Sequence, residues 1–309
     1  MEFSFVLSKL FVLFFAMAAG FWAAKKGVLT PEGDRTLSKT VVFLLNPGMV
    51  LISAMRNSHV MTNREVLNLT VIALLCYAFL ILMAKPVAWL LRAPKEKQKL
   101  YQFMFIFSNI GFFGMPMVNS LFGADAVFMV SMYMLPFQTL TFTYGITLVS
   151  GEAKYQKFQW KMLLHPMIIS TLLAYVIYLT GIRTPEFLNE AVDFLGDASS
   201  PLAMIVIGAT LARAPLKRVF GNWRLYVLTV LKMLVVPVLV LFTLRAVLPD
   251  TETNRLIIAV STTVMAMPTA ANTTILATQY HGDVETASCG VFLATAASAI
   301  TIPFLMTLL

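Results

Sequence analysis

The stretch that decides the fold is SNIGFFGMPMVN, residues 108–119, an apolar run interrupted by glycine and proline. A second stretch of the same kind, MAMPTAANT, occupies residues 265–273. Inside a bilayer an unpaired backbone group is strongly unfavourable, so an interrupted helix persists only where it is buried in protein or lines a cavity. A matched pair of such interruptions is typical of the binding site of a transporter. The two stretches therefore predict where the functional site lies.

The rest of the chain has the composition of an integral membrane protein. Of its 309 residues 59% are hydrophobic and 12% are charged, with a mean hydropathy of +0.80, whereas soluble domains carry about 25% charged residues. Membrane-spanning helices need about 20 apolar residues. Such segments are predicted at 3–24, 36–55, 66–90, 100–120, 125–149, 161–181, 190–211, 223–247, 255–279 and 284–308. We therefore expect an all-α protein of ten transmembrane helices with no soluble domain.

The basic residues gather at one side of these predicted helices, so the net charge of +8 does not indicate nucleic-acid binding. That side carries Lys25, Lys26, Arg35, Arg92, Lys95, Lys97, Lys99, Lys154, Lys157, Lys161, Arg213, Lys217, Arg218 and Arg224. The other side carries Arg56, Arg64, Arg183, Arg245 and Arg255. By the positive-inside rule the first side is cytoplasmic and both termini face outward. The tryptophans agree, because Trp22, Trp89, Trp160 and Trp223 all fall at cytoplasmic helix ends. The first helix is expected to stay uncleaved, because its basic residues follow its apolar run.

Two prolines recur at matching places in the two halves of the chain. Pro47 and Pro116 are separated by 69 residues, and Pro201 and Pro268 by 67. This near-constant spacing indicates an internal duplication. Each unit then holds five helices, and an odd number makes the second unit inverted in the membrane. The predicted organisation is a first repeat at 1–150, a cytoplasmic linker at 151–160 and an inverted second repeat at 161–309.

The interrupted helices also suggest the ligand. Each interruption exposes a new helix N-terminus, which carries about half a positive charge and favours an anion. Asparagine side chains beside the interruptions add amide donors. A proline kink that simply packs against its neighbours is the alternative. The candidate substrate-binding residues are Asn46, Asn109, Gly111, Gly114, Pro116, Lys232, Pro268 and Asn272.

Lys232 lies near the middle of its predicted helix, where a lysine costs about 2.5–3.5 kcal/mol on insertion scales and needs a partner. It could attract an anionic substrate, substitute for a coupling cation, or bind the carbonyls freed at a helix break. Carboxylates are scarce inside the predicted helices: only Asp193 and Asp197 approach the interior, and Asp197 is the better titratable candidate. Cys76 and Cys289 have no metal-type spacing. No cofactor, metal site or enzymatic site is expected.

Three stretches resemble the auxin efflux carrier family. They are MPTAANTTILATQYHGD at 267–283, the 108–116 stretch, and PLAMIVIGATL at 201–211. The resemblance covers essentially the whole chain, and the short central loop is like that of bacterial members. Thr269 departs from the pattern, because many relatives have a second proline there.

The resemblance implies a 5+5 inverted repeat related to the sodium/bile acid symporter fold, with broken helices 4 and 9 that cross at the substrate. It also implies transport of organic anions, including malonate or malate in bacteria. By position, Asn109 and Pro116 would belong to the first crossover, and Pro268 and Asn272 to the second.

The resulting expectation is a secondary transporter of small organic anions, mono- or dicarboxylates, that works by alternating access in the bacterial cytoplasmic membrane. Its expected partners are the anion and the lipid bilayer, and a homodimer is left open. The alternative is a membrane-embedded sensor or scaffold that binds an anion without moving it.

Overall fold

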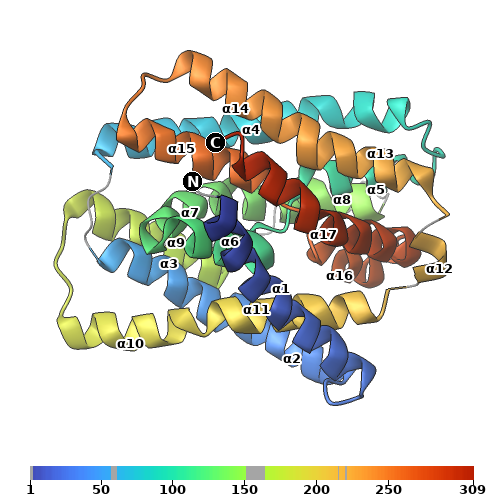
Figure 1. Ribbon diagram of the computed structural model, residues 1–309, viewed down its shortest axis with the longest axis horizontal. Helices are drawn as coiled ribbons and strands as arrows, with labels where there is room; N and C mark the ends of the chain where they lie inside the picture. The colour runs from blue at the N-terminus through green and yellow to red at the C-terminus, as the bar shows by residue number, and fades with distance from the viewer. Residues whose placement is uncertain (1–2, 57–60, 151–163, 215, 220) are drawn as a thin grey trace.

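The computed structural model describes residues 3–56, 61–150, 164–214, 216–219 and 221–309, and these are almost entirely helical (Figure 1). Within these ranges seven helices are long and apolar enough to cross a membrane. They are Ser4–Lys25, Pro31–Met55, Asn63–Leu90, Ala124–Ser150, Glu186–Ala212, Trp223–Val247 and Val284–Met306. The prediction of an integral membrane protein built of helices is confirmed. The predicted linker at 151–160 lies outside the described residues.

Three of these helices are uninterrupted single elements: α1 (Phe3–Lys25), α4 (Asn63–Leu90) and α17 (Val284–Met306). The other four are composite. They are α2 (Pro31–Thr40), η1 (Val41–Leu45) and α3 (Asn46–Met55); α7 (Ala124–Leu140), η3 (Thr141–Gly145) and α8 (Ile146–Ser150); α10 (Glu186–Asp197) and α11 (Ser199–Ala212); and α13 (Trp223–Val230), η6 (Leu231–Val235) and α14 (Val236–Val247).

Two further apolar segments are each broken into two helices. The first consists of α5 (Gln98–Ile106), then η2 (Ile110–Gly114) continuous with α6 (Met115–Phe122). The second consists of α15 (Glu252–Met265) and α16 (Asn272–Gln279). The shorter α9 (Pro166–Thr180) and α12 (Leu216–Val219) complete the fold. The sequence therefore predicted correctly that residues 100–120 and 255–279 contain interrupted helices.

The first break is not at the proline itself. Helix is absent at 107–109, whereas Pro116 lies within the 110–122 helix, two residues after the π-helical turn η2. Pro47 and Pro237 likewise follow the π-helical turns η1 and η6 by two residues. A proline cannot donate to the residue four positions back, and its ring crowds that carbonyl. The wider π-turn before each proline accommodates the missing bond without ending the helix.

Helices α1 and α11 touch through glycine. A Cβ atom built on Gly208 would lie 1.8 Å from the carbonyl oxygen of Met17, and one on Gly20 would lie 2.1 Å from that of Ile205. Only glycine allows two helix backbones to approach this closely. This close crossing joins the beginning of the first half of the chain to the second half.

Gly208→Val is expected to lower the apparent Tm of the purified protein by about 5 °C or more, because overpacking forces the two backbones apart. Thermal unfolding in detergent measures the change. Gly221→Ala is the matched control, since its Cβ would lie 3.9 Å from its nearest neighbour, the Arg218 carbonyl oxygen. Equal Tm values for the two variants would show that the α1–α11 crossing is not tight.

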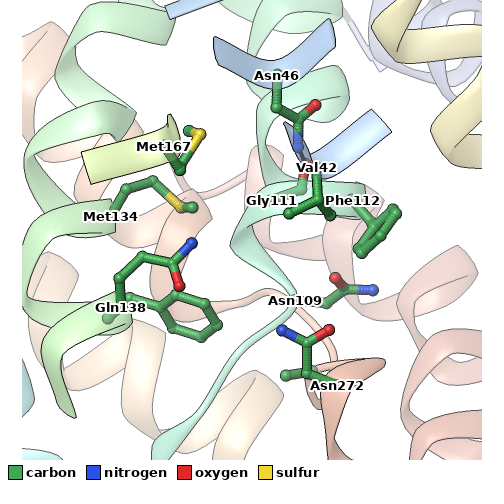
Figure 2. A pocket seen from close by; sticks show the side chains of 11 residues that line it. Val42, Asn46, Asn109, Gly111, Phe112, Met134, Gln138, Met167 and Asn272 are labelled. Carbon is green, nitrogen blue, oxygen red and sulfur yellow. Dashed lines mark hydrogen bonds between the residues drawn. The ribbon is translucent and has the colours of Figure 1, made fainter. Parts of the chain in front are cut away.

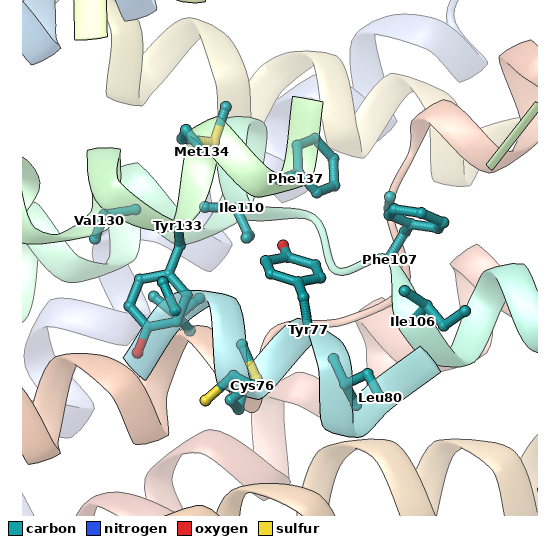
Figure 3. Packing of buried hydrophobic residues seen from close by; sticks show 14 of the residues in the cluster. Cys76, Tyr77, Leu80, Ile106, Phe107, Ile110, Val130, Tyr133, Met134 and Phe137 are labelled. Carbon is teal, nitrogen blue, oxygen red and sulfur yellow. The ribbon is translucent and has the colours of Figure 1, made fainter. Parts of the chain in front are cut away.

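An aromatic core surrounds the first broken segment. Tyr77 from α4 and Tyr133 and Phe137 from α7 pack with Phe107 and Ile110, which flank the break (Figure 3). All five side chains are buried. The non-helical chain is therefore enclosed in protein, which is the condition for its survival at membrane depth.

Candidate functional site

The two helix breaks meet and pair with each other. The Asn109 N–H donates to the Pro268 carbonyl at 2.7 Å, and the Ala270 N–H donates to the Phe107 carbonyl at 3.0 Å. These bonds form an antiparallel bridge between Ser108 and Thr269, the one β-type pairing in the described part of the chain. Each break therefore provides hydrogen-bond partners for backbone N–H and C=O groups of the other break that have no partner within their own helix.

Lys232, in the π-helical turn η6, makes hydrogen bonds to the same crossing. Its Nζ donates to the carbonyls of Met104 at 2.6 Å, Phe105 at 3.1 Å and Phe107 at 2.9 Å. These carbonyls end α5, where a helix carries partial negative charge and favours a cation. The side chain is 1% exposed, and all three of its protons have acceptors. Of the roles considered from the sequence, these contacts favour binding the carbonyls freed at a helix break.

A cavity lies beside the crossing (Figure 2). Its walls come from η1, α3, η2, α7, α9 and the start of α16, and its volume is about 30 Å³. The lining residues are Val42, Asn46, Asn109, Gly111, Phe112, Met134, Phe137, Gln138, Met167, Ala270 and Asn272. The lining therefore has four amide side chains, and no charged side chain belongs to it among the described residues.

The structure brings four of the predicted site residues to this cavity: Asn46, Asn109, Gly111 and Asn272. The other four do not line it. Pro268 contributes its carbonyl to the crossing, and Lys232 caps α5. Gly114 and Pro116 are buried in the 110–122 helix, where a Cβ on Gly114 would lie 3.4 Å from Met267. These four residues shape the crossing from outside the cavity.

Asn46 uses its amide within the protein. Its Nδ2 donates to the Gly111 carbonyl at 3.1 Å, and its Oδ1 accepts a hydrogen bond from the Ser199 hydroxyl. The side chain is 2% exposed. Asn46 therefore ties α3 to both η2 and α11, and positions the helix that begins after the break.

The 110–122 helix presents unused donors. Its N-terminus has no side-chain cap. The Asn109 carbonyl accepts from Phe113 and Gly114, and Ile110 donates to Ser108, which leaves the N–H groups of Gly111 and Phe112 with no backbone acceptor in the described chain. The buried Nδ2 of Asn109 also lacks an acceptor there. Donors without partners at a positive helix end form a site for an anion.

The second helix N-terminus also reaches the cavity, although the N–H groups of Thr273 and Thr274 already donate to the carbonyls of Ala270 and Ala271. Helix α16 begins at Asn272 and has no side-chain cap. The Asn272 side chain is half-buried and lines the cavity. Figure 2 shows the Asn272 side chain near that of Asn109, with the two amide nitrogens directed to opposite sides in this view, and both residues line the cavity.

Gln138 is a lining residue that the sequence reasoning missed. It comes from α7, is 5% exposed, and faces the cavity opposite Asn272 (Figure 2). A glutamine within an apolar helix is itself a signal, because polar groups in membrane spans are unfavourable unless they have partners or a function. Pro136 lies two residues before Gln138 without interrupting α7, and this run has no Asn/Gly/Pro cluster like those at 108–119 and 265–273.

The two aspartates considered from the sequence lie elsewhere. Asp193 on α10 forms an ion pair with Arg56 at the C-terminal end of α3, and the Arg56 Nη2 is 2.7 Å from the Asp193 carboxylate. Asp197 is exposed at the end of α10. Neither carboxylate lines the cavity. Within the described residues no group of three or more His, Cys, Asp or Glu side chains could hold a metal ion.

Comparison with known proteins identifies the family. A family model described as membrane transport protein matches residues 5–306. An uncharacterized transporter of Methanocaldococcus jannaschii is 23% identical over 299 residues, which cover 94% of each chain. A protein of Rhizobium meliloti that carries the name "Putative malonate transporter" is 27% identical over 145 residues, which cover 47% of this chain and 44% of that protein. The resemblance found in the sequence is confirmed, and the chain is related to membrane transporters rather than to enzymes.

Proposed function

Because the chain belongs to the membrane transport protein family, we propose that it is a secondary transporter of small organic anions, mono- or dicarboxylates. The observation that carries the proposal is the meeting of two uncapped helix N-termini at one cavity whose described lining holds amides and no carboxylate. Such a site attracts negative charge and offers nothing that would neutralise a cation. The relative named for malonate supports the choice of a carboxylate.

Asn109, Asn272 and Gln138 are the proposed anion contacts, together with the N–H groups of Gly111 and Phe112. Carboxylate oxygens accept hydrogen bonds only, so they match a set of N–H donors. The cavity volume of about 30 Å³ has room for one or two water molecules. A dicarboxylate therefore binds in a wider state, reached when the helices around the crossing move apart.

The proposed architecture is ten membrane-crossing segments in a 5+5 inverted repeat, with the broken segments α5–α6 and α15–α16 in equivalent places. The order of elements supports it. Within each half three proposed membrane-crossing segments precede the broken segment and one follows it, and the single-turn helix α12 is not counted as a segment. The proposed localisation is the bacterial cytoplasmic membrane with both termini outside. Alternating access would then consist of one bundle rocking against another around the crossing.

Counterflow tests the function directly. Proteoliposomes loaded with unlabelled malonate are expected to accumulate external labelled malonate transiently, and protein-free liposomes are not. Unlabelled mono- and dicarboxylates added outside should compete, whereas choline, a cation of similar size, should not. Stabilisation of the purified protein by malonate in a thermal-shift assay measures binding separately.

Two outcomes would contradict the proposal. Malonate that binds and stabilises the protein but never exchanges would indicate a sensor or scaffold. No binding and no exchange with any carboxylate of a mono- and dicarboxylate panel would exclude organic anions as the substrate class.

A further inference from the structure

A group of unpaired basic side chains lies where α4 ends and α13 begins. We define the α4–α13 basic patch as Lys85, Arg92, Lys95 and Arg224 together with Trp89 and Trp223. The end of α4 and the start of α13 lie at the same right-hand edge of Figure 1. The cavity at the crossing does not include any of these residues.

Arg224 holds the two helix ends together and leaves part of its guanidinium unused. Its Nε donates to the Leu91 carbonyl at 3.1 Å and to the Arg92 carbonyl at 3.2 Å. The terminal nitrogens have no hydrogen-bond partner among the described residues, and Cζ lies 5.2 Å from the centre of the Trp223 ring. A guanidinium held by hydrogen bonds from its Nε keeps the N–H groups of its two terminal nitrogens free. These groups can donate two parallel hydrogen bonds to the oxygens of one phosphate.

Arg92 adds a second cation at the chain reversal. Its φ is 47°, in the left-handed region that residues other than glycine rarely adopt. This conformation turns the chain away from α4 immediately after Leu91, and the Arg92 side chain is exposed. The carbonyls of Leu91 and Arg92 accept hydrogen bonds from Arg224, so the backbone of Arg92 lies beside the Arg224 guanidinium.

The neighbouring helix surface is that of a membrane interface. Trp89 is 77% exposed and Trp223 is 50% exposed. Tryptophans prefer the headgroup level of a bilayer. Lys85 lies one turn before Trp89 on the same face of α4 and is exposed. Its long side chain can therefore reach the headgroups from the apolar side. Leu82, a further turn along that face, is 69% exposed.

The patch differs from other basic residues at the same end of the molecule because its charges have no acidic partner. Lys97 pairs with Asp283 at 2.6 Å, and Arg218 pairs with Glu285. Within the described residues Lys85, Arg92, Lys95 and Arg224 form no ion pair. Several cations without partners, next to exposed tryptophans and an apolar helix face, have the charge and the amphipathic character complementary to an anionic lipid.

We propose that the α4–α13 basic patch binds one anionic phospholipid, with the phosphate on Arg224 and Arg92 and the acyl chains along Leu82 and Trp89. Lys85 and Lys95 contribute further positive charge around the headgroup. The lipid then bridges the ends of α4 and α13, which Arg224 already joins. The inference needs only that the helices span a membrane, and it does not depend on the substrate of the cavity.

The test is binding of phosphatidylglycerol to the purified protein, measured by native mass spectrometry during lipid titration. Phosphatidylcholine with the same acyl chains and free glycerol 3-phosphate are the comparison ligands. We expect phosphatidylglycerol to bind preferentially, and a Lys85→Gln/Arg92→Gln double variant to lose about tenfold or more in affinity. Neither substituted side chain bonds the backbone in the structure, so the variant should keep the fold.

The control variant is Arg64→Gln/Arg183→Gln, which removes the same charge from exposed positions at the opposite helix ends. It should bind phosphatidylglycerol within about twofold of the unmodified protein, because it leaves the patch intact. Equal affinity for the two lipids, an equal loss in both double variants, or complete competition by glycerol 3-phosphate would each overturn the proposal.

Discussion

Malonate counterflow is expected to fall at least tenfold when Asn272 is replaced by alanine, while the apparent Tm without ligand stays within about 2 °C of the unmodified protein. The Asn272 side chain lines the cavity, and no hydrogen bond joins it to another described residue. Its truncation therefore removes a donor to the ligand without breaking a bond within the protein. A hydrogen bond to a charged group is worth about 1.5–3 kcal/mol, which corresponds to roughly ten- to a hundredfold.

Asn68→Ala is the matched control, since Asn68 is an exposed asparagine on α4. It should retain unmodified rates of counterflow. If Asn272→Ala and Asn68→Ala transport equally well, the cavity beside the crossing is not the substrate site. A loss of transport together with a large fall in Tm would instead assign Asn272 to the structure of α16.

Replacing Lys232 with methionine is expected to produce the largest loss of stability, with an apparent Tm at least about 10 °C lower. The substitution removes the donor to the carbonyls of Met104, Phe105 and Phe107. A buried polar group left without a partner costs about 1–3 kcal/mol. Only the Phe105 carbonyl then loses its last partner among the described residues, because Phe107 keeps the Ala270 N–H and Met104 keeps the Thr269 hydroxyl. The three lost hydrogen bonds from a charged donor, at about 1.5–3 kcal/mol each, still sum to several kcal/mol. Thermal unfolding in detergent measures the effect.

Lys39→Met removes a lysine from an exposed position on α2 and should leave the Tm almost unchanged. The decisive comparison is between stability and binding. A Lys232→Met protein with normal Tm and no affinity for malonate would make Lys232 a ligand contact. A Lys232→Met protein with the Tm and the malonate affinity of the unmodified protein would show that the carbonyls of α5 find other partners.

The breaks could be predicted from the sequence because they leave local signals. Proline and glycine weaken a helix wherever they occur, so residues 108–119 and 265–273 were recognisable without knowledge of the fold. The exact position of the first break was harder to predict from the sequence. Pro116 remains helical because the preceding turn widens, and the backbone becomes non-helical at 107–109 instead. The position of the first break depends on hydrogen-bond partners from the second break, which are the Pro268 carbonyl and the Ala270 N–H.

The roles of individual polar residues were harder to predict for the same reason. Lys232 was recognised as a buried cation in need of a partner, but its acceptors lie more than 120 residues away in the sequence. Asn46 is predicted from the sequence as a ligand contact, and it lines the cavity, but its bonds to Gly111 and Ser199 could not be predicted. Gln138 lies on α7 two residues after Pro136, which does not interrupt the helix. Hydropathy and spacing identify that a polar group is buried, whereas its partner is fixed by the packing of distant helices.

The backbone pairing between the two breaks has a mechanical consequence. The Asn109–Pro268 and Ala270–Phe107 hydrogen bonds join the two broken segments at their non-helical parts. Lys232 in η6 donates a further hydrogen bond to the Phe107 carbonyl at the same place. A displacement of either segment alone would leave backbone groups unpaired in an apolar interior, which is strongly unfavourable. The crossing should therefore move as one rigid body. Any sliding that opens the cavity is then expected where this body meets its surroundings, such as the α3, α7 and α9 walls, and not between the two segments that are proposed to bind the anion.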